Sequence, residues 1–167
     1  MPLWTIYHPT STFTDPATKS ALANAITAIY TAVPLPAFYV NVIFIPVPAS
    51  NFYIGGVSRP SQPSSSTSEP GPDPQVPFIR ICIRNIARKI TTAQQRDRFL
   101  GRVDSALKPF IEDKGWDWEY DVEETSRDLW KIQGLVPPGP GTEAEETWKR
   151  ENRASGFEAE TGGLGKL

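Results

Sequence analysis

The order of strand-like and helix-like segments occurs twice in this 167-residue chain, and that repetition restricts the fold more than any other feature. In the first half, a strand-like stretch over 3–8 is followed by helical periodicity and then by the apolar run "AFYVNVIFI". In the second half, "PFIRICIRNIAR", another helical stripe and "WDWEYDV" follow in the same order. The sequence therefore predicts a duplicated βαβ unit, in which right-handed crossovers make the two strands of each unit parallel.

The first repeat carries clear signals for where its helix begins and ends. Thr14 and Asp15 can cap a helix, and Pro16 suits its first position. Apolar residues recur downstream at helical spacing, at Leu22, Ile26, Ile29 and Val33. The prolines that follow should end the helix. The apolar run after them is typical of a strand buried on both faces, and "NFYIGG" predicts a short hairpin that turns at two glycines.

The second repeat alternates more strictly. Isoleucines at 79, 81 and 83 share one face of the predicted strand, and Arg80, Cys82 and Arg84 share the other. Thr92 and Gln95 fit a capping box at the start of the next helix. Its apolar stripe consists of Phe99, Leu100, Val103, Leu107, Phe110 and Ile111, and Gly115 is a suitable stop.

These segments predict an α+β fold, with a four-stranded mixed sheet and two helices on one face. The domain spans 2–140, with repeats at 2–57 and 77–124, a Ser/Pro-rich insertion at 58–76 and an apolar arm at 127–138. We interpret the insertion as a mobile part of a loop. An arm of this kind often packs on another subunit. The charged, Gly-rich tail at 141–167 is expected to fray.

Composition excludes several classes of function. The net charge is −2, so there is no basic excess to neutralise the phosphates of a nucleic acid. Cys82 and His8 are the only residues of their types, which excludes a disulfide framework and a multi-histidine metal site. No apolar run reaches the roughly 18 residues of a membrane span, and no signal peptide is recognisable. We therefore expect a cytoplasmic protein that uses no metal or organic cofactor.

The second residue is the first candidate for chemistry. Pro2 follows an initiator Met, which is normally removed before so small a residue, so the mature chain would begin with a secondary amine. Burial and nearby cations would lower the pKa of that amine, and a neutral amine is a good general base. Arg84 and Arg88 could grip a substrate carboxylate with paired hydrogen bonds. A base beside such a clamp is what proton abstraction next to a keto acid requires.

Each of these residues also has a purely structural interpretation. A proline in second place is common, and the two arginines could simply pair with acidic residues. Tyr30 closes a helix and would then serve packing, as His8 and Cys82 would. The acidic residues of the last strand, Glu119, Glu123 and Glu124, would lie on a solvated surface, although one of them could activate water.

Taken together, these features resemble the tautomerase superfamily. The resemblance covers roughly 2–140 and rests on the duplicated βαβ plan, Pro2, "AITAIYTAV", "FYIGG", "FIRICIRNIAR" and "RDLWKIQGLVPP". Within the superfamily, the chain is similar to the branch typified by cis-3-chloroacrylic acid dehalogenase, especially its fungal members of the oxalocrotonate tautomerase type. The most specific element is Pro2 combined with the two-arginine strand.

The resemblance implies roles for individual residues. Pro2 matches the catalytic proline, which acts as a general base in tautomerases and as a general acid in hydration and dehalogenation. Arg84 and Arg88 match the arginines that bind the substrate carboxylate, although here they are four positions apart rather than three. Tyr120 matches a tyrosine that positions water. Tyr30 stands where the dehalogenase has a substrate-contacting histidine, and Lys131 stands where it has the glutamate that activates water.

Three functions stay open on this basis. The first is a proline-based tautomerase of 2-oxo carboxylic acids such as phenylenolpyruvate. The second is a hydratase or dehalogenase of small unsaturated or 3-halo acrylic acids, with Pro2 as general acid. The third is a family member that has lost catalysis. Lys131 argues against dehalogenation, because a charged lysine cannot activate water. The resemblance also implies a homotrimer, with a small carboxylate as the ligand.

Overall fold

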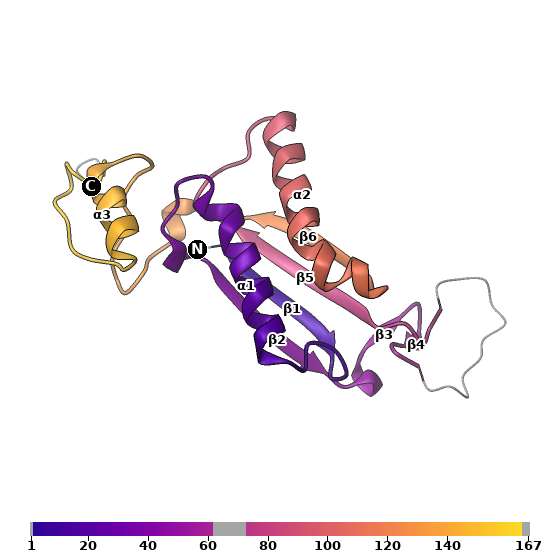
Figure 1. The fold of residues 1–167 in the computed structure, drawn as a ribbon. Helices are drawn as coiled ribbons and strands as arrows, with labels where there is room; N and C mark the ends of the chain where they lie inside the picture. The colour runs from indigo at the N-terminus through magenta and orange to yellow at the C-terminus, as the bar shows by residue number, and fades with distance from the viewer. Residues whose placement is uncertain (1, 62–72, 165–167) are drawn as a thin grey trace.

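The computed structural model describes residues 2–61 and 73–164, and it confirms the duplicated βαβ plan. The first unit comprises β1 (Leu3–Pro9), α1 (Pro16–Thr31) and β2 (Asn41–Val47). The second comprises β5 (Phe78–Asn85), α2 (Ala93–Leu107) and β6 (Asp117–Glu124). The strand order is β2-β1-β5-β6; each unit contributes a parallel pair, and β1 runs antiparallel to β5 (Figure 1). The predicted fold class, a mixed four-stranded sheet of the α+β type, is confirmed.

Both long helices begin where the sequence predicts. The carboxylate of Asp15 accepts hydrogen bonds from the backbone N–H groups of Ala17 and Thr18, and Pro16 opens α1. A complete capping box between Thr92 and Gln95 opens α2. Beyond α2 the chain continues through two 3-10 turns, η3 (Lys108–Phe110) and η4 (Glu112–Lys114), before a glycine with φ of 69° ends the turn.

The core lies between the two helices and one face of the sheet. In Figure 1, α1 and α2 cover the same face. The strands contribute alternate residues to it, as expected from the period of two. The fully buried side chains there are Trp4, Ile6, Ile79, Ile81 and Ile83 from the strands and Leu22, Ile26, Val103 and Leu107 from the helices.

The opposite face of the sheet carries charge. Arg80 forms ion pairs with Glu119 and Asp121, and the Nε atom of Arg84 lies 3.6 Å from Glu123. No helix in the described part of the chain covers this face (Figure 1). The paired arginines and carboxylates therefore form a polar layer that is open within one protomer.

The prediction that "AFYVNVIFI" is one strand buried on both faces is wrong. Its first residues form a 3-10 turn, η1 (Ala37–Tyr39), and β2 is an edge strand with Ile43 47% exposed. A strand with one neighbour and helices on one side only cannot be enclosed.

The predicted hairpin is confirmed: β3 (Tyr53–Ile54) pairs antiparallel with β4 (Val57–Ser58). The two glycines between these strands have φ of 58° and 85°, which permits the tight turn. Positions 62–72, the centre of the predicted insertion, lie outside the described residues.

The end of the chain is folded, so the expectation of a frayed tail is wrong for this part. After the turn η5 (Arg127–Leu129), the arm leads to α3 (Glu143–Glu151), beyond the end of the sheet where β1 begins (Figure 1). Trp148 of α3 is fully buried, with its ring centroid 6.2 Å from that of Tyr39. Trp130 of the arm lies against the same tyrosine at 5.0 Å. Aromatic anchors thus hold a segment whose overall composition is polar.

Candidate functional site

Pro2 is buried at the point where β1 begins. Its carbonyl oxygen accepts a hydrogen bond of 2.9 Å from the backbone N–H of Asn41, which starts β2. The antiparallel register pairs Leu3 with Arg84, so Pro2 lies one step further along, beside Asn85 at the end of β5. The amino end of the chain is therefore fixed between two strands.

A cavity of about 320 Å³ lies next to this end of the sheet. Asn85 contributes to its wall, together with residues from the last turn of α1 and the first half of α2. Ile29, Val33 and Phe99 make part of the wall apolar. Because Asn85 borders both Pro2 and the cavity, this cavity is the candidate substrate site. A larger groove, of about 700 Å³, lies between α2 and β6, and neither Asn85 nor Tyr30 lines it.

Tyr30 is brought to the cavity by the end of α1. Its hydroxyl oxygen accepts a hydrogen bond of 2.9 Å from Nε1 of Trp4, which lies two residues after Pro2 in β1. Burial raises the pKa of Tyr30 well above its usual value. The hydroxyl group therefore keeps its proton at neutral pH and can donate it in a hydrogen bond.

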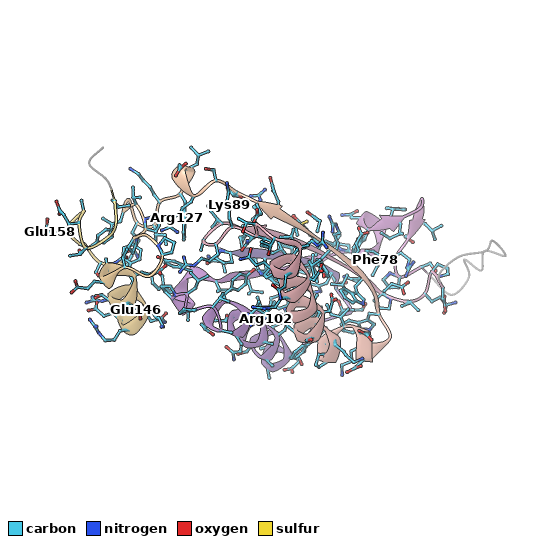
Figure 2. The ribbon with its side chains drawn as sticks, turned by 90° about the horizontal axis from the view of Figure 1, so that it is seen from above. Phe78, Lys89, Arg102, Arg127, Glu146 and Glu158 are labelled. Carbon is cyan, nitrogen blue, oxygen red and sulfur yellow. The ribbon has the colours of Figure 1, made fainter. Side chains whose placement is uncertain are left out.

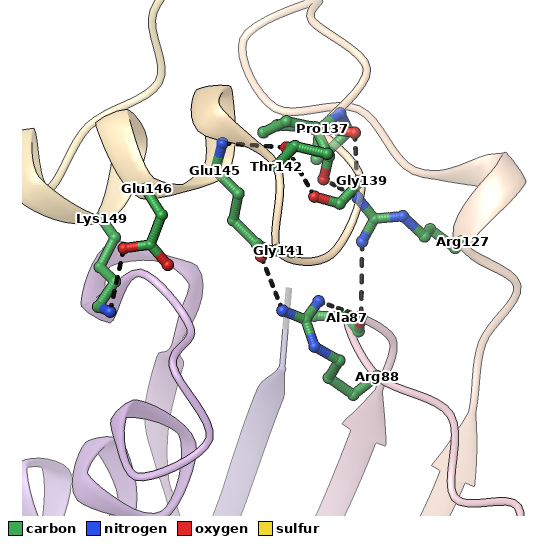
Figure 3. Close-up of polar contacts among 11 residues, drawn as sticks. Ala87, Arg88, Arg127, Pro137, Gly139, Gly141, Thr142, Glu145, Glu146 and Lys149 are labelled. Atoms are coloured by element: carbon green, nitrogen blue, oxygen red, sulfur yellow. Dashed lines mark hydrogen bonds and ion pairs between the residues drawn. The ribbon is translucent and has the colours of Figure 1, made fainter. Parts of the chain in front are cut away.

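Arg88 also lines the cavity, but its charge is already partnered. Its Nη2 atom donates a hydrogen bond of 2.8 Å to Oε2 of Glu145 in α3, and its Nη1 atom donates one of 3.2 Å to the carbonyl oxygen of Ala87 (Figure 3). Glu145 is only 1% exposed, and its Oε2 atom also accepts a hydrogen bond from the N–H of Gly141. A buried carboxylate from the C-terminal helix thus neutralises this predicted clamp residue.

Two buried polar atoms close to this ion pair have no hydrogen-bond partner among the described residues. They are Oε1 of Glu145 and the hydroxyl group of Tyr39. Burial, and then the negative charge of Glu145, raise the pKa of Tyr39 well above its usual value. Arg127 ties the arm to the same place by donating hydrogen bonds to the carbonyl oxygens of Ala87, Pro137 and Pro138 (Figure 3).

The other predicted site residues lie elsewhere in the protomer. Arg84 is on the open face of the sheet, opposite the cavity, and its side chain is 64% exposed. The Tyr120 hydroxyl group donates a hydrogen bond of 2.8 Å to Asp104 of α2, in the larger groove. Lys131 is exposed between two buried residues of the arm. Of the six predicted residues, Tyr30 and Arg88 line the cavity and Pro2 lies beside its lining residue Asn85, and the roles assigned to all six residues stay predictions.

Several residues at this end of the sheet were not singled out from the sequence. Glu145 stands three residues after Thr142, a spacing typical of a helix start, and the Thr142 hydroxyl group does cap α3. Arg98 and Arg102 are four residues apart in α2, a spacing that places both on one helix face. Neither pattern shows what these side chains contact.

Among the described residues, no group of three or more His, Cys, Asp or Glu side chains is arranged so that it could hold a metal ion. No helix in the described ranges has the length and hydropathy needed to cross a membrane.

Comparison with known proteins adds independent findings. Residues 1–153 match the family described as "Putative oxalocrotonate tautomerase enzyme". A probable enzyme from the thermophilic fungus Aspergillus fumigatus is 44% identical, with a TM-score of 0.80 over 94% of this chain and 98% of that chain. The D106A mutant of RhCC from Rhodococcus jostii RHA1 is 37% identical, with a TM-score of 0.82 over 95% of each chain.

A more distant structure shares the fold. N1, a member of the cis-3-chloroacrylic acid dehalogenase family, is 19% identical, with a TM-score of 0.61 over 90% of this chain and 97% of that chain. A search of curated proteins gave no match.

Proposed function

The chain belongs to the family of oxalocrotonate tautomerase-like proteins, and we propose that it is a cofactor-independent tautomerase of 2-oxo carboxylic acids with Pro2 as its general base. The observation that carries this proposal is the placement of Pro2. It is buried at the start of β1, beside a strand end that borders a cavity with cationic and apolar walls.

The proposed reaction moves one proton between carbon and oxygen. In the keto-to-enol direction, the neutral amine of Pro2 takes a proton from the carbon next to the keto group. The electron pair of the broken C–H bond forms the enol C=C bond, and the keto oxygen becomes negative. The resulting ammonium group of Pro2 then protonates that oxygen. The reverse sequence is ketonisation, and general acid–base catalysis of this kind is worth about 10²–10⁴-fold in rate.

Two cavity residues support the proton transfer. The Tyr30 hydroxyl group, protonated and pointing its oxygen toward Trp4, can donate a hydrogen bond to the developing enolate oxygen. Arg88 lines the same wall as a guanidinium group paired with Glu145, and with Arg84 it is the proposed carboxylate clamp. Arg84 projects from the open face of the sheet, opposite the cavity. Within one protomer, it can therefore contact a carboxylate only in a site on that open face.

The experiment is the ketonisation of phenylenolpyruvate, followed by ultraviolet absorbance, in wild type and in Pro2→Ala. We expect kcat/KM to fall by at least about 10² in the variant, as for the loss of a general base. Pro109→Ala is the matched control, because Pro109 is an exposed proline beyond α2 that lines neither cavity. Equal rates in wild type and Pro2→Ala would reject Pro2 as the base.

One observation favours the alternative function, hydration of small unsaturated or 3-halo acrylic acids with Pro2 as general acid. The Oε1 atom of Glu145 is buried and has no hydrogen-bond partner among the described residues, and a carboxylate oxygen can accept a proton from water. The exposed ammonium group of Lys131 cannot accept a proton. In this alternative, the water that gives its proton to Glu145 adds as hydroxide to one carbon of the double bond, and Pro2 protonates the other carbon. Where the hydroxylated carbon carries chlorine, its hydroxyl group then loses a proton and forms the carbonyl as the C–Cl bond breaks, and chloride leaves. Chloride release from 3-chloroacrylate that is lost in Glu145→Gln would support it.

The assembly is proposed to be a homotrimer. The open face of the sheet, with its arginine–carboxylate layer, and the exposed edge at β2 are the surfaces available for such contacts. A sedimentation mass of one protomer would contradict this assembly.

A further inference from the structure

We propose that the side-chain oxygen of Asn85 accepts a hydrogen bond from the amine of Pro2 and so holds the reactive position of that amine toward the ligand. The inference rests on the proposed function, because it takes Pro2 to be the acid–base group. Asn85 acts through Pro2 and not on the ligand, so it is a positioning residue.

The register of the sheet places Asn85 beside Pro2. The antiparallel pairing of β1 with β5 ends at Leu3 and Arg84, and the next residues along the two strands lie opposite each other. Those next residues are Pro2 and Asn85. Pro2 lies two positions before Trp4, a core residue, so it and the residue opposite it share the helix-covered face. Side chains paired in this way have Cβ atoms about 4.5–5.5 Å apart.

Asn85 interrupts the apolar pattern of β5. The helix-covered face of this strand presents fully buried isoleucines at 79, 81 and 83, and position 85 continues that series. Asn85 is itself only 5% exposed. An amide group in such a place costs free energy unless its polar atoms are hydrogen-bonded, so both the nitrogen and the oxygen of this amide need partners.

The Asn85 side chain leans toward the end of the sheet that carries the amine. Its Nδ2 atom donates a hydrogen bond of 2.8 Å to the carbonyl oxygen of Arg88, which lies beyond the end of β5. Because β1 and β5 are antiparallel, β1 begins at this same end. Figure 2 shows Lys89 just beyond this end of β5, whereas Phe78 lies at the other end of the strand. The amide therefore extends in the direction of the Pro2 nitrogen.

The partners of the amide nitrogen fix the orientation of the amide. The carbonyl oxygen of Arg88 and Oε1 of Glu124, at 3.4 Å, accept hydrogen bonds and donate none, so the nitrogen of Asn85 must face them. The oxygen Oδ1 then faces away from both, and no described residue donates a hydrogen bond to it. Asn85 lines the 320 Å³ cavity beside Pro2. The N–H group of a free Pro2 amine is the donor that this oxygen lacks.

Such a hydrogen bond would direct the proton transfer. With Met1 removed, the neutral amine of Pro2 has one N–H bond and one lone pair, and its ammonium form has two N–H bonds. When Oδ1 of Asn85 accepts one N–H, the lone pair or the second N–H is left to face the ligand, and the proton moves only there. A reacting group that is misplaced by about 1 Å can lose about 10²-fold in rate. The same hydrogen bond favours the ammonium form and so raises the pKa of Pro2 relative to an apolar neighbour.

Other titratable groups at this end of the sheet also act on the Pro2 amine. They are Tyr30 of α1, Tyr39 of η1, Arg88 and Lys89 after β5, Arg98 and Arg102 of α2, Glu124 of β6, Arg127 of η5 and Glu145 of α3, with Arg84 and Glu123 on the open face. All of them are retained when position 85 alone is changed. A difference between wild type and such a variant therefore measures what Asn85 contributes.

The test is the pKa of the Pro2 amine, measured from the ¹⁵N chemical shift against pH in protein with ¹⁵N-labelled proline, after mass spectrometry shows that Met1 is absent. Asn85→Leu removes the amide at similar size, and Asn85→Asp keeps an acceptor oxygen and adds negative charge. Asn51→Leu is the matched control, because Asn51 is an exposed residue of the turn η2 (Ala49–Asn51), which follows the other end of β2.

The two variants of Asn85 should move the pKa of Pro2 in opposite directions. We expect it to fall by about 1 pH unit in Asn85→Leu, to rise in Asn85→Asp and to stay unchanged in Asn51→Leu. The acid limb of kcat/KM for phenylenolpyruvate should move with it, and the plateau should fall at least about tenfold in Asn85→Leu. If Asn85→Leu does not fold, Asn85→Ala replaces it, with the same direction expected.

An unchanged pKa of Pro2 in Asn85→Leu would overturn the inference. A rise in both variants would also overturn it, because a merely loosened chain end returns toward the ordinary amine value of about 7.7–8.0 in either case. The titration needs no turnover. Opposite shifts without tautomerase activity support the inference and reject the proposed function, whereas Pro2-dependent turnover with identical pH profiles in wild type and Asn85→Leu supports the proposed function and rejects the inference.

Discussion

Replacing Glu145 by Ala should destabilise the whole protein, although Glu145 belongs to a tail of polar composition. The substitution removes the acceptor of two hydrogen bonds, from Arg88 and from the N–H of Gly141. Breaking a fully buried ion pair costs about 3–5 kcal/mol. The Arg88 side chain is 30% exposed, so water can solvate part of its charge. We therefore expect a loss of about 2–3 kcal/mol in the free energy of unfolding.

Urea unfolding at pH 7, followed by tryptophan fluorescence, measures this loss. Glu146→Ala is the control, because Glu146 is on the same helix, is exposed and pairs only at the surface with Lys149, so its removal should cost no more than about 0.5 kcal/mol. Replacing both partners of the buried pair, with Arg88→Met and Glu145→Leu, should cost less than Glu145→Ala alone, since no buried charge is left unpaired. Equal stabilities of Glu145→Ala and Glu146→Ala would refute the reasoning.

Three further predictions concern stability. Tyr30→Phe leaves the buried Nε1 of Trp4 without its acceptor and should cost about 1–3 kcal/mol in urea unfolding, whereas Tyr53→Phe, at an exposed tyrosine, should cost almost nothing. Trp148→Ala should cost about 3–5 kcal/mol and make the C-terminal segment exchange its amide hydrogens faster; protection unchanged from wild type would contradict the packing of α3. Burial lowers the pKa of His8, so the unfolded chain binds this proton more tightly. Stability should decline as pH falls below about 6.5, and His8→Gln should show a smaller decline between pH 7.5 and 5 in thermal unfolding.

The elements of the fold that can be predicted are those specified by local sequence patterns. Alternating isoleucines placed β5 correctly, and the Thr92–Gln95 pair placed the start of α2, because both signals act within a few residues. The burial of β2 cannot be predicted in this way, because an apolar run does not show whether a strand has one neighbour or two. The fold of the tail is unpredictable for a similar reason. Trp148 stabilises α3 through contact with Tyr39, more than a hundred positions earlier in the chain.

The candidate site was predictable only in its outline. Pro2 could be singled out because its chemistry depends on its place in the chain, and Tyr30 because the resemblance places it where the dehalogenase has a substrate-contacting histidine. Arg84 and Arg88 look equivalent in the sequence, but β5 ends at Asn85, between them. The structure separates them, since Arg84 is on the open face and Arg88 is paired with Glu145. Such pairing depends on which distant carboxylate reaches the guanidinium group, which residue spacing does not encode.

The central claim is that a free secondary amine at Pro2 performs the proton transfer. It is tested most directly by comparing ketonisation of phenylenolpyruvate by two forms of the same chain, one with Met1 removed and one with Met1 retained, each verified by mass spectrometry. Joined to Met1, the Pro2 nitrogen is an amide and cannot act as a base. We predict turnover by the first form and at least about 10²-fold slower turnover by the second. Equal rates in the two forms would contradict the account.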